Sequence, residues 1–333
     1  MRLTPTKLKL CSLPLLAWLA SVALQAQPNC GKYAVAGNTC QRYATFAWYT
    51  SGGVWQSQVS VVVPAGAPGV ATGSVTVQFG IGAGTNRGLL TGAPFSSLYG
   101  GIAGNKAYFS TIQAMIPTGG SARLDLESGA VCVGAECTQS SDLAVGAMWA
   151  IISSPDASAL DLTTLQLIYL SAPVAGAQNT TQVAVPPVFS DLASSKWITT
   201  YSETPLEKKS EEANSNNMAF SVANLSDQAQ AVTVSIYDLY GNLITSKSTP
   251  VLQGGKKEGA QVKPGDVYAD SFANFFGLAT SAVTNPLATA ALSRTGTIDG
   301  TIIFQSSAGQ PIAPLVVRAA GNSNSMMLLA PLP

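Results

Sequence analysis

The chain has 333 residues, of which 47% are hydrophobic and only 10% are charged, and it contains no histidine. This length allows one large domain or two ordinary ones, and the apolar fraction can fill a sizeable core. The polar surface must come mainly from Ser, Thr, Asn, Gln and Gly, which suits strands better than helices. The missing histidine excludes Ser-His-Asp and Cys-His catalysis in their usual forms, and most zinc sites.

The N-terminal segment has the pattern of a secretory signal. Basic residues within 2–9 precede an apolar stretch at 10–24, and small residues follow. Cleavage is expected after Ala23 or Ala26, so residues 1–26 are assigned to the signal. The alternative is an uncleaved membrane anchor. Ser12, Pro14 and Ser21 disfavour it because they interrupt the apolar stretch, and a spanning helix needs about 20 apolar residues.

Cleavage would make the mature chain slightly acidic. The full chain has 17 basic and 17 acidic residues, and all the charged residues of the signal are basic. We therefore expect no nucleic-acid partner and no electrostatic attachment to anionic lipid, since both need a basic surface. No later stretch is apolar enough to span a bilayer, so we expect no membrane span after cleavage and an extracytoplasmic location, whether secreted, periplasmic or at the cell surface.

The cysteines are consistent with export. Cys11 lies in the signal, and Cys30, Cys40, Cys132 and Cys137 remain. Four cysteines allow three disulfide connectivities, of which the two local pairs, Cys30–Cys40 and Cys132–Cys137, are the simplest. Free thiols are the alternative and are disfavoured in an oxidising compartment.

Alternation of apolar and polar residues with period two predicts a first series of strands. It occurs at 55–63, 73–79 and 123–127. The segments 145–152 and 165–170 are apolar on both faces, which is typical of central strands.

A second series of strands follows, with one short helix. The strands are predicted at 218–223, 232–237, 243–246, 298–305, 312–319 and 326–329. Gly241 and Asn242 indicate a tight hairpin between two of them. Ser271 can cap a helix that carries apolar residues at Phe272, Phe275 and Phe276 and ends at Gly277. The segment 278–296 shows no clear period and is predicted to be a loop.

The composition changes between residues 171 and 195, where three prolines and many small residues suit an extended linker. We therefore predict an all-β fold of two tandem antiparallel β-sandwich domains, at 27–175 and 196–333, joined by a linker at 176–195. The alternative for 183–185 is an edge strand of either domain. Both halves open with an aromatic segment and continue with a similar succession of strands and turns.

The second half contains Asn224-Leu225-Ser226, a Val-x-Val-x-Ile-x-Asp strand at 232–238, Lys263-Pro264-Gly265-Asp266 and the strand 300–304. In these features it resembles uncharacterised secreted tandem β-sandwich proteins of environmental bacteria, most strongly over 197–333. The resemblance implies immunoglobulin-like sandwiches and an extracytoplasmic location. It implies no catalytic residue.

No catalytic, metal or cofactor site is predicted. The glycine-rich stretch 80–84 lacks the third glycine of a dinucleotide-binding loop. Asp125 and Glu127 share the solvent face of a strand, which disfavours a glycosidase pair. Asp142, Asp156 and Asp161 lie near turns, where Asp usually caps, although a calcium site is an alternative.

Aromatic residues are the candidate ligand-binding residues. Trp48, Tyr49 and Trp55 flank a predicted turn at 51–53, where aromatic faces can stack on sugars or contact a protein. The competing interpretation places them in the core. The sequence thus favours a non-catalytic adhesion, binding or structural module that acts through sandwich-end loops on a glycan or cell-envelope protein. The alternatives are a carbohydrate-binding module accessory to an enzyme and a filament or surface-layer subunit.

Overall fold

The computed structural model describes most of the chain after the signal segment. The described residues are 29–51, 55–63, 75–81, 94–98, 107–108, 111–116, 121–126, 130–133, 136–139, 144–171, 181–209, 215–255, 257–258, 261–262, 264–320 and 325–329. The predicted signal 1–26, with Cys11, lies outside them. Antiparallel strands dominate, and the few helices are short, so the predicted all-β class is confirmed.

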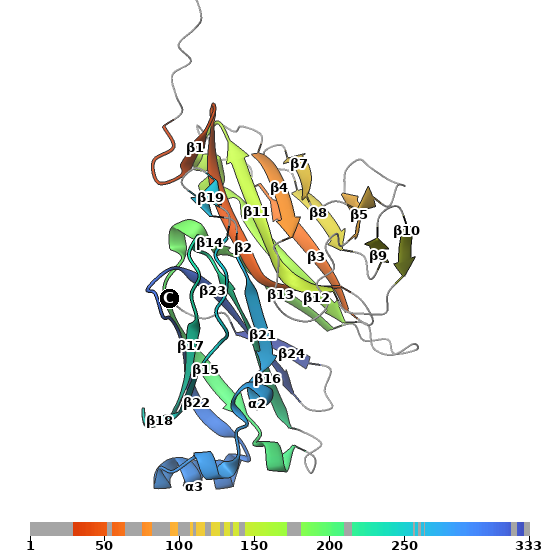
Figure 1. Cartoon of the computed structure of the whole chain (residues 1–333). Helices are drawn as coiled ribbons and strands as arrows, with labels where there is room; N and C mark the ends of the chain where they lie inside the picture. Colours follow the sequence, from red (N-terminus) through yellow and green to blue (C-terminus); the bar gives the residue numbers. More distant parts are fainter. Residues whose placement is uncertain are drawn as a thin grey trace, which may run out of the picture.

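The first half of the chain forms two large antiparallel sheets (Figure 1). The β2 sheet has the order β1 (Ala34–Ala36), β2 (Thr39–Ser51), β11 (Ala144–Ser154), β4 (Val75–Ile81) and β7 (Thr111–Ile116), with β14 (Val188–Phe189) also pairing with β2. The β3 sheet has the order β13 (Thr181–Val185), β12 (Thr164–Ser171), β3 (Trp55–Val62), β8 (Ser121–Leu126), β5 (Pro94–Leu98) and β6 (Ala107–Tyr108). A separate hairpin joins β9 (Ala130–Val133) to β10 (Glu136–Gln139).

The second half forms two four-stranded sheets. The β17 sheet has the order β15 (Lys196–Glu203), β22 (Ile298–Ser306), β17 (Val232–Asp238) and β18 (Leu243–Ser248). The β16 sheet has the order β21 (Val267–Ser271), β16 (Asn216–Asn224), β23 (Ile312–Ala320) and β24 (Ser325–Leu329). A short hairpin pairs β19 (Lys257–Glu258) with β20 (Gln261–Val262).

The two halves repeat one strand order. Eight strands correspond in chain order: β2, β3, β4, β7, β8, β11, β12 and β13 in the first half, and β15, β16, β17, β18, β21, β22, β23 and β24 in the second. If each set is numbered from one to eight, both halves have one sheet in the order 1-6-3-4 and one in the order 8-7-2-5. The weak similarity between the halves in sequence therefore corresponds to a common topology.

The core of the second half lies between its two sheets. Strand β17 alternates buried and half-buried residues along its whole length, as the period-two pattern predicts. From the opposite sheet, Phe220 packs against the rings of Phe272, Phe275 and Phe304. These rings belong to one buried cluster to which both sheets contribute, so burial of this cluster holds the sheets together.

The junction between the halves is packed. Five buried residues of the second half, Ala223, Leu225, Val267, Ala313 and Leu315, belong to the same hydrophobic cluster as Phe46 and the core of the first half. The segment 176–195, predicted as a linker, contains β13, β14 and the 3₁₀ turn η1 (Ser190–Leu192). β13 pairs with β12, so the alternative interpretation of 183–185 as an edge strand holds.

Two of the short helices each follow a strand in the chain. α1 (Ala157–Leu162) follows β11, and α2 (Phe272–Phe276) lies where the sequence predicts a helix, with Ser271 accepting from the Asn274 N–H and Gly277 at φ 64°. The 3₁₀ turn η2 (Leu206–Lys208) follows β15, and η3 (Thr280–Ala282) follows α2.

The predicted loop 278–296 is instead partly helical, because it contains α3 (Pro286–Thr295). Asn285 caps the helix, Pro286 occupies its first position and Gly296 ends it at φ 71°. α3 lies at the end of the molecule farthest from the sheets of the first half (Figure 1).

Candidate binding surface at the distal end

The structure places the predicted aromatic residues only by their backbone. Trp48 and Tyr49 belong to β2, and Trp55 begins β3. Their side chains and the connection 52–54 lie outside the described residues. Their ligand-binding role therefore stays a prediction.

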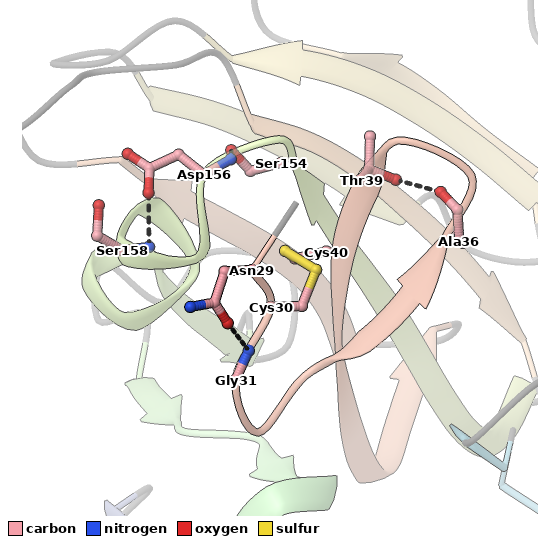
Figure 2. Close-up of a disulfide and its surroundings, with 9 residues drawn as sticks. All are labelled: Asn29, Cys30, Gly31, Ala36, Thr39, Cys40, Ser154, Asp156 and Ser158. Carbon is pink, nitrogen blue, oxygen red and sulfur yellow. Dashed lines mark hydrogen bonds between the residues drawn. A yellow bond between two sulfur atoms is a disulfide. The ribbon is translucent and has the colours of Figure 1, made fainter. Parts of the chain in front are cut away.

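Two of the four predicted disulfide cysteines are joined. Cys30 and Cys40 form a disulfide with 5.2 Å between their Cα atoms, which ties the first turn of the described chain to β2 (Figure 2). Thr39 donates to the Ala36 carbonyl beside it. A disulfide is compatible with an oxidising compartment outside the cytoplasm.

The other pair is placed by strand register. In the β9–β10 hairpin, residue Cys132 lies directly opposite Cys137. Their side chains lie outside the described part of the chain, so this disulfide stays a prediction. The register favours the local connectivity over the two crossed ones.

The acidic residues near turns have structural partners. Asp156 caps α1 by accepting from the Ser158 N–H at 2.9 Å (Figure 2). Asp161 accepts from the Tyr33 hydroxyl and pairs with Lys32 at 3.1 Å, and these contacts lower its pKa. No group of three or more metal-ligating side chains occurs among the residues that the structure describes. Asp142 and Glu127 lie outside them, and Asp125 belongs to β8.

A buried ion pair anchors the junction. The Arg42 guanidinium donates to both carboxylate oxygens of Asp191, at 3.0 and 3.2 Å, and its charge lies 3.7 Å above the Phe189 ring. It also donates to the Leu160 carbonyl. This arrangement fixes η1 against β2 and α1 and leaves no free charge for a ligand.

A second buried carboxylate lies at the far end of β15. Glu203 is 2% exposed, and the Lys209 ammonium lies 2.5 Å from it. The Tyr201 hydroxyl donates to its other oxygen at 3.4 Å. Burial raises the pKa of Glu203, while the lysine and the tyrosine lower it. Both carboxylate oxygens of Glu203 are therefore engaged by neighbouring side chains, which favours a structural role.

The β17–β18 hairpin forms one part of the distal end. Asp238 accepts from the backbone N–H groups of Tyr240 and Asn242, at 2.8 and 2.9 Å, and Gly241 takes φ 82°. Burial would raise the pKa of Asp238, but these donors outweigh it, so the pKa is lowered. A carboxylate that accepts several N–H bonds holds the turn in one conformation.

α3 forms the other part. Asn285 accepts from the N–H groups of Leu287 and Ala288, at 2.9 and 3.1 Å. A small pocket separates the helix from the hairpin, lined by Leu239 and Ile244 on one side and by Ala288 and Ala291 on the other. The hairpin tip and α3 are therefore neighbours, although more than forty residues separate them in the chain.

Large apolar side chains are exposed on the two elements that line this pocket. Leu239, Tyr240 and Leu243 on the hairpin and Leu287 on α3 are between 49% and 60% exposed. We call these four residues the distal apolar patch. The two carboxylates beside it, Asp238 and Asp299, already accept hydrogen bonds from Asn242 and Thr297. The patch thus offers apolar contact area with little competing charge.

Sequence reasoning missed this patch. Leu239 and Tyr240 stand immediately before the predicted Gly-Asn turn, and an apolar pair at a hairpin tip is an available signal. Leu287 was not recognised as an exposed helix residue, because 278–296 was predicted to be a loop.

Within the described part of the chain, no helix has the length and apolar character needed to cross a membrane. No protein-family model, curated protein or solved structure matches this chain.

Proposed function

We propose that the protein is a secreted or cell-surface, non-catalytic binding module that contacts a cell-envelope protein through the distal apolar patch. The observation that carries this proposal is the joint exposure of Leu239, Tyr240, Leu243 and Leu287 at one end of the molecule. Scattered apolar residues are normal on a protein surface, but a cluster on neighbouring elements marks an interaction site.

The shape and chemistry of the patch favour a protein partner. Three of its four side chains are leucine, which packs against apolar protein surface. The pocket between the β17–β18 hairpin and α3 is too small for an extended ligand. The N-terminal signal pattern and the Cys30–Cys40 disulfide support a location outside the cytoplasm.

The domain organisation belongs to the same proposal. The repeated strand order supports two tandem β-sandwich domains at 27–175 and 196–333. An immunoglobulin-like assignment stays a prediction. In both halves, strand two lies beside strand five and strand three beside strand six, as strands B and E and strands C and F do in the immunoglobulin fold. Both halves differ from that fold in that strand one lies beside strand six.

The test is binding of the purified mature protein to cell-envelope fractions, measured by co-sedimentation. Changing Leu239→Ser together with Leu287→Ser should weaken binding roughly tenfold or more, because it removes apolar area from the contact and adds two hydroxyl groups there. Treating the envelope fraction with a protease should abolish binding.

The matched control is Leu192→Ser. Leu192 is equally exposed, at 59%, but it lies in η1 at the junction between the halves. Equal loss of binding in Leu192→Ser and in the patch variant would contradict the proposal, as would full binding by the patch variant.

A carbohydrate ligand is the second candidate, favoured by the exposed ring of Tyr240 at the hairpin tip. Aromatic faces stack on sugar rings, whereas leucine does so poorly. Binding that survives protease treatment and is lost on Tyr240→Leu would favour this candidate over a protein partner.

A further inference from the structure

Strand β18 is an open edge of the β17 sheet. It pairs with β17 on one side, and no other strand in the described chain pairs with it. Ser246, Lys247 and Ser248 are exposed, while Ile244 and Thr245 are half-buried. An exposed edge presents unpaired N–H and C=O groups that can bind another strand.

The register shows which residues point their main-chain groups outward. Thr249 donates its N–H to the Val232 carbonyl, so this pair is hydrogen-bonded. Bonded and non-bonded pairs alternate along an antiparallel ladder. Lys247 and Thr245 therefore bond to β17, whereas Ser246 and Ser248 point their N–H and C=O groups away from it. The register shifts just beyond Thr245, where Tyr237 pairs with Leu243, so the alternation is not extended to Ile244.

The side chains agree with this assignment. The Ser235 and Ser246 hydroxyls lie 2.8 Å apart, and those of Thr233 and Ser248 lie 3.0 Å apart. Such close cross-strand contacts are typical of non-hydrogen-bonded pairs. In the described residues, no hydrogen bond outside the β17–β18 ladder engages the outward main-chain groups of Ser246 or Ser248.

We propose that β18 pairs antiparallel with β18 of a second copy, joining two β17 sheets into one continuous sheet across a two-fold axis at Ser246. About this axis Ser246 meets its own symmetry mate, and Ile244 meets Ser248. The Ser235–Ser246 hydroxyl row then continues into the second copy. An isologous contact of this kind closes on itself, so it makes a dimer and not a filament.

Lysine on an edge strand usually blocks such pairing. Here the Lys247 ammonium donates to the Phe275 carbonyl at 2.6 Å and lies 4.9 Å from the Phe275 ring centre. Its charge is therefore held against α2 instead of projecting from the edge. In the symmetric pair Lys247 stands opposite Thr245, so no like charges are directly opposed.

The opposite edge of the same sheet is less open. On β15, the Ser194 side chain bonds both main-chain groups of Lys196, and the Ser202 N–H points at the Met218 sulfur. Among the described residues of this edge, the stretch around Ile198 and Thr200 remains without such a contact. This difference selects β18 as the edge for a second copy.

The test is sedimentation velocity of the mature protein from micromolar to millimolar concentration, which should show a monomer–dimer equilibrium. Ser246→Pro removes an outward N–H and leaves the bonds to β17 intact. It should weaken dimerisation roughly tenfold or more, because each dimer loses two main-chain hydrogen bonds. Ser246→Ala, which keeps the N–H, and Thr200→Pro, on the β15 edge, should dimerise as the wild type does.

Cross-linking gives a readout that does not depend on proline. Opposed residues in a hydrogen-bonded antiparallel pair have Cα atoms about 5.5 Å apart, which a disulfide can bridge. Oxidised Ser246→Cys should form a covalent dimer, and Thr200→Cys should stay monomeric. A protein that is monomeric at every concentration, or dimerisation unaffected by Ser246→Pro, would overturn the proposal. So would failure of Ser246→Cys to cross-link.

Discussion

The surroundings of single side chains in this protein shift their pKa values in directions that the sequence does not reveal. Glu203 and Glu207 lie four residues apart, yet burial raises the pKa of Glu203, whereas hydrogen bonds from the side chain and the main chain of Thr280 lower the pKa of exposed Glu207. The run of charged residues at 203–212 is a sequence pattern typical of a solvated loop. Its first member is instead buried beside Tyr201 and paired with Lys209.

These opposite shifts predict opposite pH dependences. The folded state holds the Glu203 proton more tightly than the unfolded state does, so the stability linked to this group is present at low pH and is lost as pH rises through the raised pKa. Glu203→Gln cannot ionise. Its free energy of unfolding, measured by urea denaturation, should therefore increase relative to wild type between about pH 4 and pH 7.

Glu207→Gln is the matched control with the opposite sign. A lowered pKa contributes stability above the ordinary pKa that is lost on acidification. This variant should therefore lose stability relative to wild type as pH rises from about 3 to about 5, up to the ordinary pKa of glutamate, and the difference should stay constant above it. Parallel pH profiles for the two variants would contradict the assignment of both sites.

At the scale of elements, the sequence predicted a hairpin or helix correctly where the residues that begin and end it were both recognisable. The Gly241-Asn242 turn produced the predicted hairpin, and Ser271 and Gly277 delimit α2 as predicted. α3 was missed because its apolar residues, Ala288, Ala291 and Leu292, are mostly small and give a weak helical period. Its cap, Asn285, and its terminator, Gly296, are clear in retrospect.

The cap of α3 can be tested directly. Asn285→Ala removes the acceptor for the Leu287 and Ala288 N–H groups and should lower the free energy of unfolding by about 1 kcal/mol. Because α3 carries Leu287, the same change should weaken envelope binding. Thr284→Ala, at the exposed neighbouring position, serves as control, and an equal loss in both variants would show that capping is not the cause.

At the scale of the molecule, the junction couples the two halves. Leu315 of β23 is buried in the cluster that contains Phe46 of β2, and the Arg42–Asp191 pair holds the connecting segment in place. A Pro-rich composition indicated an extended linker, but β13 and β14 are built into the sheets of the first half.

A shared core predicts cooperative unfolding. Calorimetry of the mature protein should show one transition, with calorimetric and van't Hoff enthalpies that agree. Leu315→Ala should shift that whole transition and cost about 2–5 kcal/mol. Leu252→Ala, buried in the second cluster, should shift the same transition. Two transitions, of which Leu315→Ala moves only one, would show that the halves unfold independently.

The sequence by itself determined the class of structure, because the period-two alternation of Val, Ile and Phe is a local property that decides which faces of a strand can be buried. It also determined the main turns, where glycine, proline and asparagine act through their own backbone preferences. Only the tertiary structure decided the common strand order of the halves, the shared core, the open edge at β18 and the distal apolar patch. Each of these depends on residues far apart in the chain, which alternation and turn chemistry cannot bring together.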